Sequence, residues 1–198
     1  MNIDWDPPQP RRGLLGEWDK FVGPGQTRAE FWLILIPSVV AALGVAAYAH
    51  FQVLHWNGLQ YAVAMLMAFD LTGGIVCNAT TAAKRWYHRP GQGPVLHVGF
   101  IAVHIVYFLL VAWLFRGMDW LYFAVFSVLL LGFSLVALAV PLYLQRAVTL
   151  LLYATVLLVA FFGFSAITGL EWFIPLLFLK LLVSHLPKEA PYLPELKG

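Results

Sequence analysis

The pattern of hydrophobic and polar positions along this chain consists mainly of long apolar runs, each about long enough to cross a membrane. An α-helix rises about 1.5 Å per residue, so about 20 apolar residues span the hydrocarbon core of a bilayer. The connections between the runs are short, which favours antiparallel packing of neighbouring helices. The pattern therefore predicts an all-α, polytopic integral membrane protein with six transmembrane helices. The predicted spans are residues 30–51, 59–84, 94–115, 119–144, 147–168 and 171–186.

The polar segments outside these runs divide the chain into three parts. We expect residues 1–28 to be a cytoplasmic N-terminal segment, residues 29–187 the six-helix domain and residues 188–198 a cytoplasmic tail. Thr27 precedes Glu30 at the spacing of a capping box, which marks the start of the first span. Residues 11–21 have the pattern of a helix that lies on the membrane surface. The acidic, proline-rich start lacks the basic-then-apolar order of a signal peptide, so we expect no cleavage.

Lysine and arginine are distributed unequally between the two predicted sides. Arg116 falls on one side and Lys180 within the sixth span, which leaves ten of the 12 basic residues on the side of both termini. Because loops rich in Lys and Arg remain in the cytoplasm, both termini are predicted to be cytoplasmic. We expect the membrane to be the inner membrane of a bacterium. The ten residues are Arg11, Arg12, Lys20, Arg28, Lys84, Arg85, Arg89, Arg146, Lys188 and Lys197.

Composition agrees with a membrane location. Hydrophobic residues make up 61% of the 198 residues and charged residues 11%, whereas soluble domains are about 25% charged. The net charge of +2 is too small to indicate a nucleic-acid partner. The single cysteine, Cys77, excludes a disulfide within the chain.

Three ionisable residues fall near the middle of the predicted bilayer. Asp70 lies in the second span, His104 in the third and Lys180 in the sixth. A charged residue at that depth costs about 2.5–3.5 kcal/mol on insertion scales, and such residues are usually paired and functional. A carboxylate beside an imidazole can transfer a proton. We therefore predict Asp70 as an acid/base group, His104 as its partner and Lys180 as an electrostatic stabiliser.

Helical spacing groups further polar residues with these three. Asp70, Gly74, Asn78 and Thr81 follow steps of four, four and three, which place them on one face of a helix. Similar spacings join His97 to His104 and Ser184 to Lys180, so three polar faces could enclose a pocket open to the cytoplasm. Basic residues at the depth of the lipid head groups could bind an anion there. The predicted substrate-binding residues are Asn78, Thr81, Lys84, Arg85, Arg89, His97, Ser184 and His185.

A purely structural interpretation is also open. Asp70 and Lys180 could neutralise each other, while the other polar groups form hydrogen bonds between helices. Gly73 and Gly74 would then serve only to let helices approach closely.

Metal binding is a further alternative, and the cofactor is otherwise unknown. Asp70 and His185 could bind a metal together with His97 or His104. Both histidines could not join the same ion, because their seven-residue separation corresponds to about 10 Å along the helix. His97 and His185 are the candidate pair for haem ligation. On the opposite side of the membrane, a second candidate metal or cofactor site comprises His50, His55, Asp119 and Glu171.

These observations favour an integral membrane enzyme that acts on a lipid-like substrate with a polar or anionic head group. The sequence contains no G-x-S-x-G, phosphate-loop or G-x-G-x-x-G pattern, so it does not specify a reaction. One alternative is a small proton-coupled transporter or channel that uses the same residues. Another is a non-catalytic subunit of a larger membrane complex. Expected partners are membrane lipid and a second copy or another membrane subunit.

Overall fold

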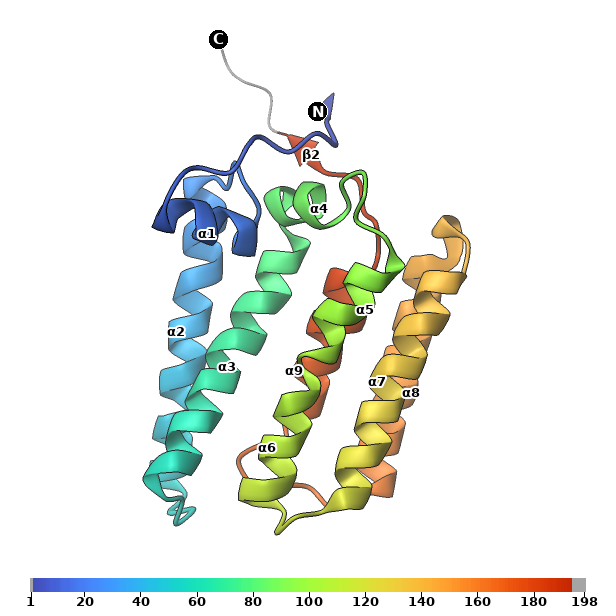
Figure 1. Cartoon of the computed structure of the whole chain (residues 1–198). Coiled ribbons are helices and arrows are strands. Elements are labelled where there is room, and N and C mark those ends of the chain that lie inside the picture. Colours follow the sequence, from blue (N-terminus) through green and yellow to red (C-terminus); the bar gives the residue numbers. More distant parts are fainter. Residues whose placement is uncertain (1, 194–198) are drawn as a thin grey trace.

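The structure is a computed structural model that describes residues 2–193, and it is a bundle of roughly antiparallel helices (Figure 1). Five helical spans are long and apolar enough to cross a membrane, and a shorter apolar helix follows them. The predicted fold class, a polytopic all-α membrane protein, is confirmed. The elements are β1 (Asn2–Ile3), α1 (Leu14–Val22), α2 (Arg28–Phe51), α3 (Gly58–Ala79), α4 (Thr81–Tyr87), α5 (Pro94–Ala102), α6 (Ile105–Phe115), α7 (Trp120–Ala139), α8 (Leu142–Gly163), α9 (Phe173–Phe178), the π-helix η1 (Leu179–His185) and β2 (Tyr192–Leu193).

Capping boxes begin two of the spans. At the start of α2 the Thr27 side chain accepts a hydrogen bond from the Glu30 backbone, and the Glu30 side chain accepts one from the Thr27 backbone. The box predicted from the sequence is therefore confirmed. Asn57 and Gln60 form the same arrangement at the start of α3. These side chains satisfy backbone N–H groups that have no partner within the helix.

Thr80 ends the second span earlier than predicted. Its backbone is extended, with φ −71° and ψ 154°. The hydroxyl donates to the carbonyl of Cys77 and accepts from the backbone N–H of Ala83, so it caps the separate helix α4. Threonine competes with the helix for backbone groups in this way. The expectation of one helix over residues 59–84 is corrected accordingly.

Pro141 shifts the boundary between the fourth and fifth spans. Proline disfavours a helical conformation at the residue before it, and Val140 is extended, with φ −80° and ψ 150°. Helix α7 therefore ends at Ala139 and α8 begins at Leu142, instead of the predicted loop near residues 145–146. The third span, residues 94–115, has the predicted bounds, and Val103 and His104 form a turn within it between α5 and α6.

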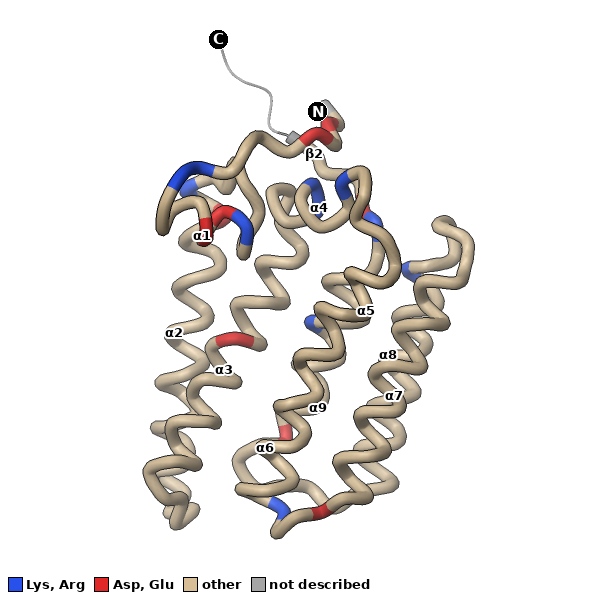
Figure 2. Tube along the Cα trace, in the orientation of Figure 1, with Lys and Arg blue, Asp and Glu red and all other residues tan. Residues whose placement is uncertain are grey.

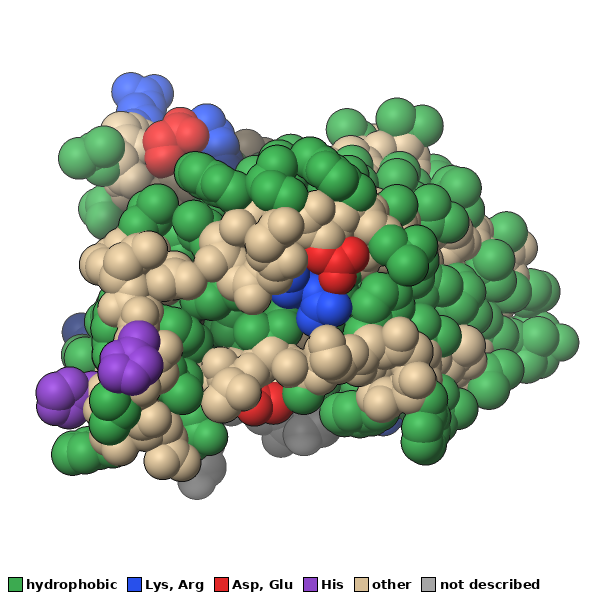
Figure 3. Space-filling view, turned by 90° about the horizontal axis from the view of Figure 1, so that it is seen from below, with side chains coloured by type: hydrophobic (Ala, Val, Ile, Leu, Met, Phe, Trp, Pro, Cys, Tyr) green, Lys and Arg blue, Asp and Glu red, His purple; other side chains and the backbone are tan. Residues whose placement is uncertain are grey.

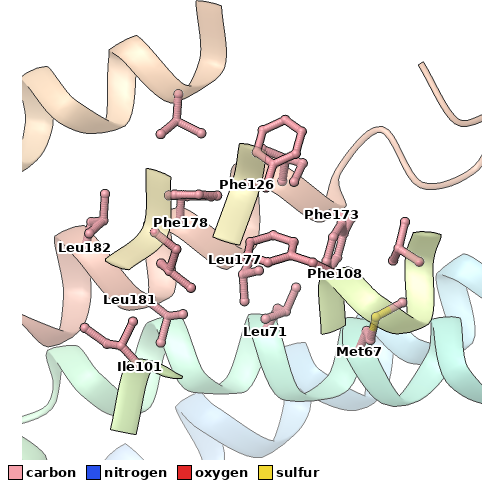
Figure 4. Close-up of a cluster of buried hydrophobic side chains, with 14 of the residues drawn as sticks. Met67, Leu71, Ile101, Phe108, Phe126, Phe173, Leu177, Phe178, Leu181 and Leu182 are labelled. Carbon is pink, nitrogen blue, oxygen red and sulfur yellow. The ribbon is translucent and has the colours of Figure 1, made fainter. Parts of the chain in front are cut away.

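The short sixth helix lies at the centre of the bundle, where α9 and η1 pack against α3, α7 and α8. Close-packed aromatic side chains surround it (Figure 4). Phe108 of α6 lies 5.9 Å, centroid to centroid, from both Phe173 and Phe178, and 6.0 Å from Phe126 of α7. All four side chains are fully buried. Because protein surrounds this helix, it can contain Pro175 and Lys180 and be less apolar than a helix that faces lipid.

The two ends of the described chain lie together at one end of the bundle. Strands β1 and β2 pair antiparallel, with Asn2 opposite Leu193 and Ile3 opposite Tyr192. Helices α1 and α4 lie at the same end. Most Lys and Arg residues also gather there, and Figure 2 shows few charges along the length of the helices. This end, called the basic end below, is the one predicted to be cytoplasmic.

Candidate functional site

Asp70 and Lys180 form an ion pair in the middle of the bundle. Lys180 Nζ lies 2.6 Å from Asp70 Oδ2, and the Lys180 and Asp70 side chains are 4% and 23% exposed. Lys180 Nζ also lies 3.1 Å from His104 Nε2. The structure thus brings together the three residues that the sequence predicts as the chemical centre. A long-range ion pair of this kind joins α3 to η1 across 110 positions of the chain.

The hydrogen bonds of His104 define which of its nitrogens carries the proton. His104 Nδ1 lies 2.9 Å from the carbonyl oxygen of Phe100, an acceptor, so Nδ1 must donate. Nε2 then carries a lone pair and accepts from the Lys180 ammonium group. Position 104 lies at the turn between α5 and α6, which aims the imidazole inward across the bundle. A neutral imidazole whose acceptor nitrogen faces an ammonium group can take up a proton from it.

Tyr107 belongs to the same cluster, although the sequence analysis did not select it. Its hydroxyl donates to Asp70 Oδ2 at 2.9 Å, the oxygen that also accepts from Lys180. Tyr107 lies three positions after His104, so it falls on the same face of α6. This spacing could have indicated that Tyr107 joins the cluster. Tyrosine is uncharged and common in membrane proteins, however, so its depth alone did not separate it from the other tyrosines.

Two glycines allow α3 to approach its neighbours at the level of Asp70. A Cβ atom at Gly73 would overlap Ser38 Oγ of α2, and a Cβ atom at Gly74 would overlap the Cδ, Cε and Nζ atoms of Lys180. The close approach expected for these glycines is therefore present. Gly74 has a second consequence, because it gives the lysine side chain a path across α3 to Asp70.

A cavity of about 350 Å³ extends from this cluster toward the basic end. Its volume lies within the usual range for small-molecule sites, about 300–1,000 Å³. Two of its lining residues, Phe69 of α3 and Val103 at the end of α5, are 40% and 65% exposed. In a membrane these two positions would face lipid. The lining residues are Trp18, Phe21, Val22, Phe31, Ile34, Leu35, Ser38, Phe69, Asp70, Gly73, Gly74, Cys77, Asn78, Tyr87, Phe100, Val103, His104 and Lys180.

Helix α1 forms the end of the cavity nearest the basic end. Trp86 Nε1 donates to the carbonyl of Lys20 at 2.9 Å, and the Tyr87 hydroxyl donates to the carbonyl of Phe21 at 2.8 Å. These bonds attach α1 to α4. Burial raises the pKa of the Tyr87 hydroxyl well above its ordinary value, so it remains a donor. A helix, Leu14–Val22, is present within residues 11–22, where the sequence predicts a helix on the membrane surface.

The N-terminal segment is fixed to α1 by a second ion pair. Arg11 Nη2 lies 2.7 Å from Asp19 Oδ1, and the backbone N–H of Arg11 donates to Asp19 Oδ2 at 2.8 Å. The hydrogen bonds from Arg11 lower the pKa of the Asp19 carboxyl. Asp19 therefore stays ionised and holds the start of α1 in place.

A second polar layer lies between the ion pair and the basic end. Asn78 Nδ2 donates to the carbonyl of Lys180 at 3.3 Å, and Ser184 Oγ donates to the carbonyl of Ile75 at 2.9 Å. Both bonds connect α3 to the π-helix η1. His97 Nδ1 and His185 Nε2 lie 3.0 Å apart and form a hydrogen bond with each other. Of these four predicted substrate-binding residues, Asn78 lines the cavity, while the other three connect helices.

His88 adjoins this pair of histidines. The ring of His88 lies 4.9 Å from that of His97, centroid to centroid, and His88 Nε2 lies 3.2 Å from the carbonyl oxygen of His185. Burial, together with the nearby Lys84 charge, lowers the pKa of His88 to about 3. His88 is therefore neutral at physiological pH and donates to that carbonyl.

The three basic residues predicted to bind an anion are bound to protein groups instead. Lys84 Nζ donates to the carbonyls of Ser184 and Pro187, each at 2.7 Å, so it caps the end of η1. Arg85 pairs with Asp4 at 2.8 Å. The Arg89 guanidinium lies 3.6 Å from the centroid of the Trp86 ring. Within the described part of the chain, none of the three lines the cavity.

Thr81 also lies away from the cavity. It begins α4, beyond the break at Thr80, and its hydroxyl donates to the carbonyl of Tyr192 at 3.0 Å. The expectation that Thr81 continues the face of Asp70 and Asn78 is corrected, because the break rotates the chain. Thr81 instead attaches the C-terminal strand β2 to α4.

The candidate metal groups are not assembled. Among residues 2–193, no group of three or more His, Cys, Asp or Glu side chains is placed to hold a metal ion. Figure 3 shows the end opposite the basic end, where the histidine side chains lie at one edge, apart from the acidic and basic groups. Arg116 there pairs with Asp119 at 2.8 Å, and Asp119 also caps α7. His97 and His185, the candidate haem pair, bind each other directly.

The fold and this site define a polytopic helical membrane protein with an Asp–Lys–His–Tyr cluster beside an apolar cavity. Comparisons with known protein families, with curated proteins and with solved structures found no match. The geometry of the site is therefore the basis for proposing a function.

Proposed function

We propose that this protein is an integral membrane enzyme that takes a lipid-like substrate from the bilayer and carries out acid–base chemistry on its polar group. The single observation that supports this most directly is the cavity itself. Its walls are apolar and include the exposed side chains of Phe69 and Val103, while Asp70, His104 and Lys180 also line it. An apolar chain would occupy the walls, and the polar group would lie against the cluster.

The chemistry follows from the three side chains. Asp70 accepts hydrogen bonds from Lys180 and Tyr107 at the same carboxylate oxygen, Oδ2. His104 offers a lone pair at Nε2, so it can act as a base, and the Lys180 ammonium can stabilise developing negative charge. Asn78, whose side chain also lines the cavity, would orient the substrate. In this proposal the basic end is cytoplasmic, the membrane is a bacterial inner membrane and lipid is the natural partner.

A photoactivatable single-chain lipid, with a diazirine in its alkyl tail, tests whether the cavity binds such a molecule. The purified protein in nanodiscs is illuminated with the probe, and the labelled residues are mapped by mass spectrometry. Leu35→Trp fills the cavity, whereas Leu43→Trp adds the same bulk to α2 at a position that is 59% exposed. We expect labelling at Val103 and Phe31 that Leu35→Trp abolishes and Leu43→Trp preserves. Uniform labelling of lipid-facing residues would contradict the proposal.

Turnover is tested with a bacterial lipid extract as the substrate pool. We expect the wild-type protein to deplete at least one lipid species. The Asp70→Asn variant should leave the amount of that lipid unchanged while remaining folded. Equal depletion by both proteins would show that Asp70 takes no part in the reaction.

Proton-coupled transport is the second candidate, and the interrupted helices favour it. His104 lies at the break between α5 and α6, and Lys180 lies in the π-helix η1. Transporters often place binding sites at such breaks near the middle of the membrane. Asp70-dependent proton flux into liposomes that contain the purified protein would favour transport over catalysis.

A further inference from the structure

The side chain of Lys180 is held in one position at the inner end of the cavity. Its stem lies against Gly74, where any Cβ atom would overlap it, and its Nζ atom lies between Asp70 Oδ2 and His104 Nε2. The residue is 3% exposed, yet it lines the cavity. The amine is therefore reachable from the cavity and from little else.

The cavity offers this amine to an apolar molecule whose polar group is uncharged. Lys180 already has its counter-ion in Asp70, so it is not a free positive charge for an anionic head group. The nearby basic residues are also occupied, because Lys84 binds the carbonyls of Ser184 and Pro187, and Arg85 pairs with Asp4. Aromatic and aliphatic walls complete the cavity. This combination favours a neutral polar group, such as a carbonyl, on an apolar chain.

Lysine amines in desolvated pockets form Schiff bases with carbonyl substrates. We propose that Lys180 forms a Schiff base with an apolar aldehyde bound in the cavity, with Asp70 as the counter-ion. The inference rests on the proposed function, since it requires that the cavity binds a lipid-like molecule. It goes further by naming the carbonyl group as the reactive end and Lys180 as the nucleophile.

The neighbours of Lys180 supply the proton transfers that this reaction needs. His104 Nε2 takes one proton from the ammonium group, and the neutral amine then adds to the carbonyl carbon to form a C–N bond. The carbinolamine loses its hydroxyl as water when the proton returns, which gives a protonated imine. The overall reaction is R–CHO plus Lys–NH₃⁺ to R–CH=NH⁺–Lys plus H₂O. Charge is conserved, so Asp70 faces a cation at Lys180 both before and after the reaction, while His104 carries the proton in between.

Reductive trapping tests this directly on the full-length protein in nanodiscs. Decanal is added together with sodium cyanoborohydride, which donates hydride to the imine and makes the adduct permanent. Peptide mapping then measures the modified fraction at each lysine. We expect Lys180 to be modified about ten-fold faster than Lys20 and Lys188, because the cavity concentrates and orients the aldehyde. Glyceraldehyde, a polar aldehyde, should show no preference for Lys180.

Variants that keep Lys180 separate an effect on its reactivity from a failure to fold. Leu35→Trp should abolish the preference for Lys180 by filling the cavity, and Leu43→Trp should retain it. Asp70→Asn should slow trapping at Lys180 while leaving trapping at Lys188 unchanged. Modification of Lys180 no faster than that of Lys20 and Lys188 would overturn the Schiff base. If the photoactivatable lipid still labels Phe31 in that case, and Leu35→Trp abolishes this labelling, the proposed function stands; if neither reagent reaches the cavity, both proposals fail.

Discussion

The side chain of Lys180 lies directly against the backbone of Gly74, so that a Cβ atom at position 74 would overlap its Cδ, Cε and Nζ atoms. The lysine cannot move aside freely, because Nζ is bound to Asp70 at 2.6 Å and to His104 at 3.1 Å. The contact between α3 and the π-helix η1 therefore depends on the absence of a side chain at position 74.

Gly74→Ala should destabilise the protein even though alanine favours a helix. Overpacking of a well-packed site costs about 1–3 kcal/mol, and here it also displaces Lys180 from Asp70. Unfolding in mixed micelles with increasing SDS measures the effect. Gly99→Ala in α5 is the matched control, since nothing lies within 4 Å of a Cβ atom there. That substitution should be neutral or stabilising by up to about 1 kcal/mol.

Removing one member of the ion pair should cost more than removing both. Asp70→Asn or Lys180→Met leaves an unpaired polar or charged group in the bundle, which costs about 3–5 kcal/mol for a buried pair. The double variant leaves no uncompensated charge, so we expect it to recover much of that stability. The same SDS unfolding assay compares the three proteins. If the double variant also depletes the lipid species and undergoes labelling like the wild type, the pair has only a structural role.

Tyr107→Phe should produce a smaller loss. The variant removes the hydroxyl that donates to Asp70 Oδ2 at 2.9 Å. Hydrogen bonds between side chains in membrane proteins contribute about 0.6 kcal/mol on average and up to about 1.7 kcal/mol. Because the acceptor here is charged, we expect a loss near the upper end of that range, about 1.5 kcal/mol. Tyr143→Phe, at a position that is 82% exposed, should change the unfolding free energy by less than about 0.5 kcal/mol. Equal effects of the two substitutions would argue against the bond to Asp70.

Stability should rise as the pH increases through the alkaline range, because of Lys84. Burial lowers the pKa of Lys84 from 10.5 to about 8. Between these two values the unfolded chain binds more protons at this residue than the folded chain, so raising the pH favours folding. The gain in stability from Lys84 is absent below about pH 8 and complete above about pH 10.5. Thermal unfolding across that range measures the slope.

Lys84→Gln should remove this part of the pH dependence. Lys20→Gln is the control, since Lys20 pairs with Glu17 at the surface with 53% of its side chain exposed. That substitution should leave the slope unchanged. A slope in Lys84→Gln as steep as in the wild type would assign the effect to another group.

Hydropathy alone was sufficient to predict the class of protein and the depth of the central residues. Apolar length defines a membrane-spanning helix because the bilayer has a fixed thickness. The helical rise then places Asp70, His104 and Lys180 at a common level, and the structure brings these three residues together. The capping box of Thr27 and Glu30 was equally predictable, since it depends on residues three positions apart.

Other features depend on contacts between segments that are far apart in the chain. Helical spacing does not show which acceptor a long Lys or Arg side chain reaches, and Lys84 is bound by carbonyls 100 and 103 positions away. The break at Thr80 similarly depends on whether one hydroxyl competes with the helix for backbone groups.

The sequence by itself thus determined that apolar helices of membrane length follow one another, that both chain termini lie at a common end and that Asp70, His104 and Lys180 lie at a common level, because these follow from local length and polarity. Only the tertiary structure decided that Tyr107 joins the cluster, that the basic residues Lys84, Arg85 and Arg89 bind protein groups, and that an apolar cavity lies beside the cluster. Those features depend on how each helix is rotated and how closely it approaches its neighbours. Side-chain packing across the whole bundle sets both quantities.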